Sequence, residues 1–346
     1  MASKTWTQTA QVAFTYVGTV VGAGFASGQE ILQFFTRYGA AASLTIALAS
    51  VLFVWLGIKM MLMAHDVRAE SYEDLNIALF GPKIGRWISL FTLFVLFGIS
   101  SVMLAGGGTV FSEHLSLPFQ SGLLVTAILS YAVITRGIGA IMAVNTVVVP
   151  VMATFSLILV FYTNKLPTSQ AWLTLGTDHS PLSVWTAPLL YVGFNLATAQ
   201  AVLVPLGAQI KDRRVLFRGA LLGGLGIGLL LFAAHYALSA QMPGIRQFGI
   251  PMARIMDGLG TVIPFVYLLV IYGEIFTTYL SNTYGLTLQL QQRTGLGRRT
   301  VLLLLIALSY IVSLIGFKPL LSALYPLFGL VSSVWLAVMM WRNRSV

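Results

Sequence analysis

Long apolar segments separated by short polar connectors run along the whole sequence. Eight of these segments contain no Asp, Glu, Lys or Arg: 38–58, 87–112, 137–164, 180–210, 219–245, 275–292, 300–317 and 319–341. Each is close to or longer than the ~18–20 residues that a helix needs to cross the hydrocarbon core of a bilayer. Barrel strands would instead be segments of about 10 residues in which apolar and polar positions alternate. The pattern therefore predicts an all-α, polytopic membrane protein.

Breaker residues divide the apolar segments into ten expected transmembrane helices. Gly81-Pro82 and Pro243-Gly244 are two of the connector signals. The expected spans are 8–36, 41–64, 84–112, 119–135, 138–163, 183–209, 217–240, 258–290, 299–316 and 318–341. An odd number of spans in each set of five gives the two sets opposite orientations. We therefore expect two inverted five-helix repeats, residues 1–163 (with a connector at 65–83) and residues 183–341.

Composition supports a membrane protein and excludes several other classes. Only 9% of the 346 residues are charged and 57% are hydrophobic, whereas soluble domains carry roughly 25% charged residues. Cys is absent, which excludes a disulfide framework and a Cys-based metal site. The N-terminal segment lacks a small-residue cleavage pattern, so we expect a retained span there. A soluble enzyme, a secreted scaffold and a disordered regulator are excluded.

The basic residues fall mainly on one side of the predicted topology. With the N-terminus in the cytoplasm, 15 of the 20 Lys and Arg residues face inward and the other five face outward. The positive-inside rule therefore predicts ten spans in the cell (inner or plasma) membrane with both termini cytoplasmic. The formal net charge of +10 therefore does not require a nucleic acid partner. The expected partner is the lipid bilayer.

Two connectors carry signals of their own. Ser71-Tyr72-Glu73-Asp74 has the form of a capping box and predicts a short helix toward Phe80 at the cytoplasmic interface. Residues 251–257 form either a short helix that acts as a lid or a plain connector.

The first span contains a stretch that disfavours a continuous helix. Four Gly residues occur between Gly18 and Gly28, and each weakens a helix by about 1 kcal/mol. Ser27 and Glu30 then have the spacing of a capping box, which predicts a second helix start inside the span. The N-terminal amides of that second half would face whatever fills the gap. Close packing through small residues is the alternative interpretation.

The sixth span carries a second irregularity in the corresponding position of the other repeat. Gly193 offers a weak point, and Asn195, Thr198 and Gln200 place polar groups at mid-depth. Broken helices at matching positions of inverted halves indicate a transporter site near the membrane midplane. We therefore expect spans one and six to be discontinuous.

These segments resemble a known architecture. Gly18-x-x-x-Gly22-x-Gly24 and Gly193-Phe194-Asn195 are similar to the unwound segments of the LeuT-fold amino acid–polyamine–cation superfamily. The run GTVVGAGFASGQEI at 18–31 resembles the opening signature of the YkvI-like bacterial membrane proteins. The resemblance covers the ten-span layout, although its most specific part is only this run. It implies alternating access, with spans one, two, six and seven as a moving bundle and spans three, four, eight and nine as a scaffold.

A lone carboxylate lies in the middle of the eighth span. Glu274 is the only charged residue between 258 and 292, and it is costly in a bilayer unless it is protonated, paired or bound to a cation. Thr277 and Thr278 follow at i+3 and i+4 on the same helical face. This oxygen cluster suits Na⁺, and the protonatable carboxyl suits H⁺. A protonated Glu274 that only bonds a neighbouring helix is the structural alternative.

The resemblance adds ligands to this cluster. In LeuT-fold symporters a sodium site lies between spans one and eight, and this implies the carbonyl groups of Gly18 and Val21 together with Thr277 and Thr278. Glu274 departs from the family pattern, which has a small residue there, so Na⁺ and H⁺ both stay open. No other cofactor or metal is expected, because the His residues are scattered.

We expect the protein to be a secondary active symporter of a small, amino acid-like solute, not an enzyme. Glu30 and Gln29 are gate candidates. The expected substrate-binding residues lie in the two irregular segments: Val20, Gly22, Ala23, Gly24, Ser27 and Gly28 in span one, and Tyr191, Gly193, Phe194 and Asn195 in span six. A ligand-sensing or channel-like receptor subunit on the same fold is the alternative function. Oligomeric state is left open.

Overall fold

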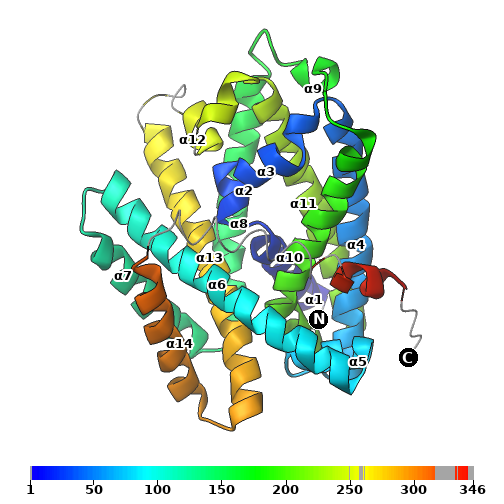
Figure 1. Cartoon of the computed structure of the whole chain (residues 1–346), viewed down its shortest axis with the longest axis vertical. Helices are drawn as coiled ribbons and strands as arrows, with labels where there is room; N and C mark the ends of the chain where they lie inside the picture. Colours follow the sequence, from blue (N-terminus) through cyan, green and yellow to red (C-terminus); the bar gives the residue numbers. More distant parts are fainter. Residues whose placement is uncertain are drawn as a thin grey trace.

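The described part of the chain is built from helices alone. The structure, a computed structural model, describes residues 2–248, 250–256, 260, 262–315, 332 and 334–341, without the side chains of residues 2–4 and 114. The helices are α1 (Ala2–Val20), α2 (Ala23–Ser27), α3 (Gln29–Phe34), η1 (Thr36–Tyr38), α4 (Ala41–Val67), α5 (Tyr72–Phe80), α6 (Pro82–His114), α7 (Phe119–Ile134), α8 (Ile138–Thr163), α9 (Ala171–Thr174), α10 (Pro181–Gln209), α11 (Arg213–Ser239), η2 (Gly244–Gln247), α12 (Pro251–Met256), α13 (Val262–Thr294) and α14 (Arg298–Ser313). Figure 1 shows them as one elongated bundle.

Nine of the ten expected spans correspond to these helices. Span one comprises α1, α2 and α3, and the next eight are α4, α6, α7, α8, α10, α11, α13 and α14. Six helices within the described residues are long and apolar enough to cross a bilayer: α4, α6, α8, α10, α11 and α13. Most of the tenth expected span, 318–341, lies outside the described residues, as do Lys318, Arg342 and Arg344.

The helices pack as two groups around the first span. The helices α4, α10 and α11 pack extensively against one another or against α1, whereas α13 packs mainly against α6 and also against α14. Figure 1 shows α6 crossing in front of α13, with α7 and α14 on the same side. Helix α8 lies between the groups and contacts α1, α11 and α13. The groups contain the spans expected to form the bundle and the scaffold.

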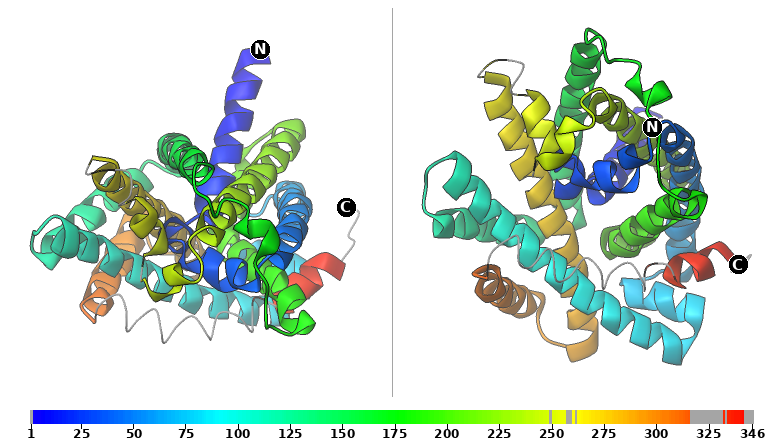
Figure 2. Two further views of the ribbon diagram at one scale, coloured as in Figure 1. Left: turned by 90° about the horizontal axis from the view of Figure 1, so that it is seen from above. Right: turned by 45° about the horizontal axis from the view of Figure 1, so that its top comes forward.

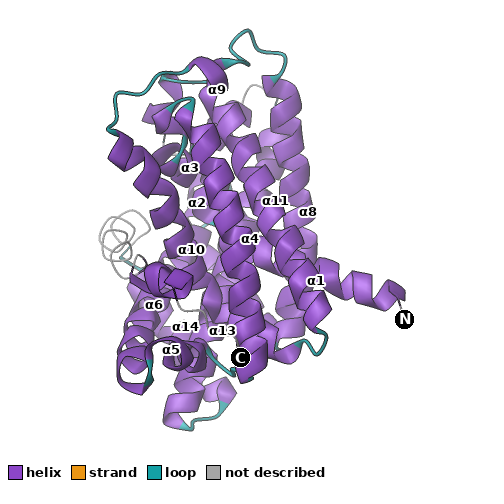
Figure 3. Ribbon diagram, turned by 90° about the vertical axis from the view of Figure 1, so that its right-hand side faces the viewer, coloured by secondary structure: helices purple, strands orange, loops and turns teal. Residues whose placement is uncertain are grey.

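The N-terminal end of α1 extends away from the other helices. Figures 2 and 3 both show this end protruding from the side of the molecule. Trp6 is 57% exposed there, and the guanidinium of Arg218 on α11 stacks over its ring at 5.4 Å. Farther along α1, Tyr16 is fully buried and its hydroxyl donates to the carbonyl of Phe53 on α4 at 2.8 Å. Packing therefore fixes the second half of α1 in the bundle.

The predicted connector helix is confirmed as α5. Ser71 accepts a hydrogen bond from the backbone N–H of Glu73 at 3.2 Å, and the Asp74 carboxylate accepts from the N–H of Ser71 at 3.1 Å, which completes a capping box. The carboxylate of Glu73 is paired with Arg293 at the end of α13 through bonds of 2.7 and 3.0 Å. These contacts tie α5 to the α13 end that lies opposite α9.

The sixth span is continuous, so the prediction of a break there is wrong. Helix α10 runs from Pro181 to Gln209 without interruption. Asn195 donates to the carbonyl of Tyr191 at 2.9 Å, and Thr198 donates to the carbonyl of Asn195 at 3.0 Å. These polar side chains satisfy themselves on their own helix. A methyl group built on Gly193 would lie 3.0 Å from the carbonyl oxygen of Ser332, so this glycine permits close packing instead of unwinding.

Candidate functional site

The helix of the first span is interrupted at Val21 and Gly22, between the end of α1 and the start of α2. Val21 donates the last backbone hydrogen bond of α1, to Val17 at 2.7 Å, and the next helical bond runs from Ala26 to Gly22 at 3.0 Å. Gly22 is extended, with φ −111° and ψ −163°. The carbonyl oxygens of residues 18–21 therefore receive no backbone hydrogen bond in the described part of the chain. In a bilayer such groups require a partner in the protein, water or a ligand.

The span has a second interruption at Gly28, where the predicted capping box is wrong. Gly28 has φ +84° and is itself the cap of α3, with no side-chain cap. Ser27 instead donates to the carbonyl of Gly24 at 3.0 Å and lies 3.4 Å from the amide of Gln29. The half-helix that begins at Ala23 consequently has only five residues. The N-terminal dipole of this five-residue helix is weaker than the dipole of the longer second half-helix that the capping box predicted.

The unwound segment lies directly against α13. A methyl group built on Gly22 would lie 2.7 Å from the hydroxyl oxygen of Thr278. Tyr267, eleven residues earlier on α13, donates to the carbonyl of Ala26 at 2.5 Å. These two contacts hold the break against the stretch of α13 that contains Glu274. The expected approach of spans one and eight is present.

Glu274 is completely buried at this contact. Its side chain is 0% exposed, and neither carboxylate oxygen has a hydrogen-bond partner among the described residues. Thr277 and Thr278 donate to its backbone carbonyl at 3.1 and 2.8 Å, which leaves their oxygen lone pairs available. A buried ionised carboxylate without a partner is strongly unfavourable. The group therefore requires a bound proton or a cation.

A small cavity opens where the break, α6, α10 and α13 meet. Its volume is about 50 Å³, which is room for only a few water molecules. Eight of the lining residues were among the predicted sites: Val20, Gly22, Ala23, Gly24, Glu30, Phe194, Asn195 and Thr278. Six were not: Thr19, Ile99, Val102, Met103, Thr198 and Asn282.

Several predicted residues lie elsewhere. Tyr191 does not line this cavity; it is fully buried in an aromatic cluster with Phe34, Phe35 and Phe53, at centroid distances of 5.1 to 6.1 Å. Gly18 packs against α8, since a methyl group there would lie 1.9 Å from the amide oxygen of Asn145. Gly193, Ser27 and Gly28 are not among the lining residues, and neither are Val21, Thr277 and Glu274, which were predicted to bind the coupling ion.

The gate candidates make different contacts. Gln29 donates through its side-chain amide to the carbonyl of Phe248 at 2.8 Å. The carboxylate of Glu30 folds toward the cavity, and its Oε1 is 2.0 Å from a methyl group built on Gly24. A short helix, α12 (Pro251–Met256), is present in the segment expected to be either a lid or a plain connector, and Met252 lies 2.8 Å from a methyl group built on Gly28. Residue 257 lies outside the described residues.

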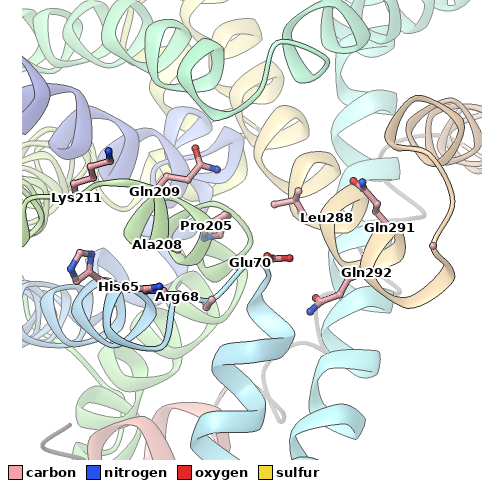
Figure 4. A pocket seen from close by; sticks show the side chains of 12 residues that line it. His65, Arg68, Glu70, Pro205, Ala208, Gln209, Lys211, Leu288, Gln291 and Gln292 are labelled. Carbon is pink, nitrogen blue, oxygen red and sulfur yellow. The ribbon is translucent and has the colours of Figure 1, made fainter.

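Larger hollows lie at both ends of the molecule. At the α5 end, a pocket of about 880 Å³ is lined from the ends of α4, α10 and α13, with Arg68, Glu70 and Lys211 among its side chains (Figure 4). At the α9 end, a hollow of about 550 Å³ is lined by Tyr162 and Arg254, among others. The central cavity is much smaller than either.

The histidines do not gather at a site. His235 is buried on α11, and its Nδ1 lies 3.1 Å from the hydroxyls of Thr36 and Ser239. Among the described residues, no group of three or more His, Asp or Glu side chains is placed to hold a metal ion.

Comparison with known proteins identifies relatives over nearly the whole chain. The membrane protein YkvI of Bacillus subtilis (strain 168) is 39% identical over 336 residues, which cover 96% of this chain and 95% of that protein. Protein YyaD of the same organism is 26% identical over 316 residues, 91% of each chain. No family model matches the sequence.

Among solved structures, a Na⁺-coupled sialic acid symporter in a substrate-bound outward-open state has a similar fold. The TM-score is 0.70 at 14% sequence identity, and the similarity covers 96% of this chain and 78% of that one. That symporter has the LeuT fold. The identity and coverage shared with YkvI, together with this fold, show that the chain belongs to the YkvI family of membrane proteins.

Proposed function

We propose that the protein is an ion-coupled symporter that moves a small, amino acid-like solute across the cell membrane by alternating access. The observation that carries the proposal is the cavity at the break of span one, where free backbone carbonyls meet Thr278 on α13 next to a buried carboxylate. Discontinuous helices that line a cavity are the usual substrate and ion sites of secondary transporters. The two repeats, 1–163 and 183–341, would be related by inversion.

The coupling ion would bind between α1 and α13. The carbonyls of Gly18 and Val21 lack backbone donors, and the hydroxyls of Thr277 and Thr278 retain their lone pairs. This set of uncharged oxygens suits Na⁺, which also drives the symporter of similar fold. Glu274 would either add charge to this site or carry a proton in place of the metal ion. Both versions give the buried carboxyl the partner it requires.

Alternating access fits the distribution of space in the molecule. A cavity of about 50 Å³ at the centre and hollows of about 880 and 550 Å³ at the two ends match a transport site that is closed in this state. The contact of α12 with Gly28 and the bond from Gln29 to Phe248 would cover the site at the α9 end. We take the α5 end as cytoplasmic, in accordance with the positive-inside rule.

Transport by purified protein in liposomes tests the proposal. Radiolabelled amino acids and small amines would be offered under an inward Na⁺ gradient, an inward proton gradient, or neither. We expect accumulation above the external concentration with one gradient and only equilibration, or no entry, without it. A ligand-sensing subunit would bind a solute and never accumulate it, and a channel would equilibrate it under all three conditions. Either result would contradict symport.

A further inference from the structure

The C-terminal segment, defined here as residues 332 and 334–341, contacts three other helices of the fold. Residues 334–341 are helical and are drawn in red in Figure 1, where they lie between α4, α5 and α10. Trp335, Leu336 and Met339 are buried. The segment is therefore packed into the molecule through its side chains.

The segment is joined to α4 and α10. The Nζ atom of Lys59 on α4 donates to the backbone carbonyl of Met339 at 2.7 Å. The same ammonium lies 5.7 Å from the centre of the Trp55 ring, where cation–π attraction holds it in place. On α10, a methyl group built on Gly193 would lie 3.3 Å from the Cβ atom of Leu336. A hydrogen bond from a charged donor is about twice as strong as a neutral one, so Lys59 provides the strongest of these contacts.

The segment is also joined to α5. The indole N–H of Trp335 donates to the side-chain oxygen of Asn76 at 3.0 Å, and the amide nitrogen of Asn76 donates to the hydroxyl of Ser89 on α6 at 3.0 Å. Asn76 is fully buried, so water does not compete for either bond. Helix α5 is in turn fixed to α13 by the ion pair of Glu73 with Arg293. Through α5 the segment is therefore linked to α6 and α13.

These bonds cross the boundary between the two groups of helices. Lys59 belongs to the group that contains α4, α10 and α11, whereas Asn76 is bonded to α6 and, through α5, tied to α13. If the two groups separate at the α5 end, the segment cannot keep both bonds. Contacts that exist in only one conformation stabilise that conformation.

We propose, on the basis of the alternating access inferred above, that the C-terminal segment is a latch that stabilises the conformation in which the cytoplasmic side is closed. Lys59 is the anchor of the latch on the first group, and Asn76 is its anchor on the second. The bond from Lys59 to Met339 breaks when the groups separate at the cytoplasmic end. Lys59, Asn76 and Trp335 are not among the lining residues of the central cavity, so the latch sets how often the inner path opens and leaves solute recognition unchanged.

A single introduced thiol can report this opening, because the chain contains no Cys. Thr198→Cys places the thiol in the lining of the central cavity, and a membrane-impermeant thiol reagent is added to inside-out or right-side-out vesicles. In this background Lys59→Met removes the charged donor and keeps a long side chain. We expect labelling from the cytoplasmic face to become at least about fivefold faster, because the loss of a hydrogen bond from a charged donor shifts an equilibrium by roughly that factor or more.

Labelling from the outer face separates a latch from a loss of stability. Release of a latch increases the population that is open to the cytoplasm, so labelling from the outer face should not become faster. Faster labelling from both faces would indicate a general loosening of the fold and would overturn the proposal. Equal labelling of the Thr198→Cys protein with and without Lys59→Met would also overturn it.

Matched variants identify the bonds responsible. Lys59→Arg keeps a charged donor and should label more slowly than Lys59→Met, whereas Lys83→Met makes the same chemical change at an exposed lysine on α6 and should have no effect. Trp335→Phe removes the indole N–H and should also speed labelling from the cytoplasmic face. The double variant Lys59→Met/Trp335→Phe should label little faster than the faster single variant, because a latch that is released at one end no longer acts at the other. Fully additive effects would contradict a shared latch.

The outcome is separable from that of the transport assay. Labelling that Lys59→Met leaves unchanged, in a protein that accumulates a solute under an ion gradient, would overturn the latch and leave symport intact. Faster cytoplasmic labelling of Lys59→Met, in a protein that accumulates no solute under either gradient, would support the latch and contradict symport.

Discussion

The first and sixth spans carry similar sequence signals and have different structures. Both contain glycine and polar residues at mid-membrane depth, but span one is divided into α1, α2 and α3 whereas α10 is continuous over 29 residues. In span one the glycines repeat, and Gly28 adopts φ +84°, which side-chain-bearing residues rarely adopt. In span six Gly193 is the one glycine at mid-depth, and it faces Ser332 and Leu336. Repeated glycine is not sufficient to unwind a helix, because α11 is continuous through the glycines at 219, 223, 224, 226 and 228; span one differs in that its glycines coincide with an extended residue at Gly22 and a left-handed one at Gly28.

Because of this difference, the two spans contribute different chemical groups to the cavity. The break leaves main-chain carbonyls without backbone donors next to α13 and the cavity, whereas α10 is continuous and contributes Phe194, Asn195 and Thr198 to the described lining. Main-chain groups provide ion and solute ligands without the need for charged side chains, which are costly in lipid. In the proposed function the ion and the solute therefore bind mainly to span one, and span six only lines the cavity.

The largest effect on transport should come from Glu274→Gln. The substitution preserves shape but removes the buried acidic group that faces the break. We expect gradient-driven uptake to fall at least about tenfold, or about 1.4 kcal/mol, with the protein still monodisperse. The measurement is uptake in proteoliposomes across a range of pH and Na⁺ concentration.

Glu113→Gln is the matched control, because it makes the same chemical change at an exposed position. Coupled transport by Glu274→Gln at the wild-type rate and with the wild-type ion dependence would eliminate the ion-site proposal.

A smaller effect is expected from Gly22→Ala. The new methyl group would lie 2.7 Å from the hydroxyl oxygen of Thr278, so the break and α13 must separate slightly. We expect an increase of roughly fivefold to tenfold in the ion concentration that half-saturates transport, equivalent to about 1–1.4 kcal/mol. Titration of uptake against Na⁺ and against pH measures this shift. An unaltered titration would mean that the contact carries no ion.

Thr278→Val should have a weaker effect of the same kind. It removes one hydroxyl ligand while it keeps the volume of the side chain, and we expect a few-fold loss in apparent ion affinity, about 0.5–1 kcal/mol. Thr154→Val on α8 is a suitable control, because that hydroxyl also bonds its own helix, at 2.9 Å, but is exposed. Equal ion affinities for the two variants would argue against a ligand role for Thr278.

Gly193→Ala should change transport least. Its methyl group would lie 3.0 Å from a backbone oxygen, so we expect a loss of stability of about 1–3 kcal/mol from overpacking. The ion and solute dependence of transport should stay at wild-type values. Thermal unfolding and uptake titrations on the same preparation separate the two effects. A shift in ion affinity as large as that of Gly22→Ala would remove the distinction between the spans.

Much of the fold was predictable because membrane spans depend on long uncharged runs. The connector helix α5 was predictable from its capping box, and the break in span one from its repeated glycines. The sequence did not reveal that Asn195 and Thr198 would bond their own helix, because polar residues that unwind a helix and polar residues that satisfy themselves have the same composition. That ambiguity produced the wrong prediction for span six.

The α6 residues that line the cavity were less predictable than the lining residues from the break of span one. Ile99, Val102 and Met103 belong to an uncharged run in which every position is apolar or small, so lipid-facing and cavity-facing residues look alike. Asn282 lies on α13 two turns beyond Glu274, and its polarity within an apolar span was the signal that could have identified it. Glu30 was predicted as a gate, and its place over Gly24 follows only from the αL turn at Gly28.

Amide hydrogen exchange measured by mass spectrometry on the purified protein in lipid nanodiscs tests the central contrast most directly. Amides of residues 18–28 should exchange much faster than those of 190–200, because several in the first segment lack helical acceptors. A transported solute or the coupling ion should slow exchange in the first segment selectively. Equal and strong protection of both segments, unaffected by either addition, would contradict the account.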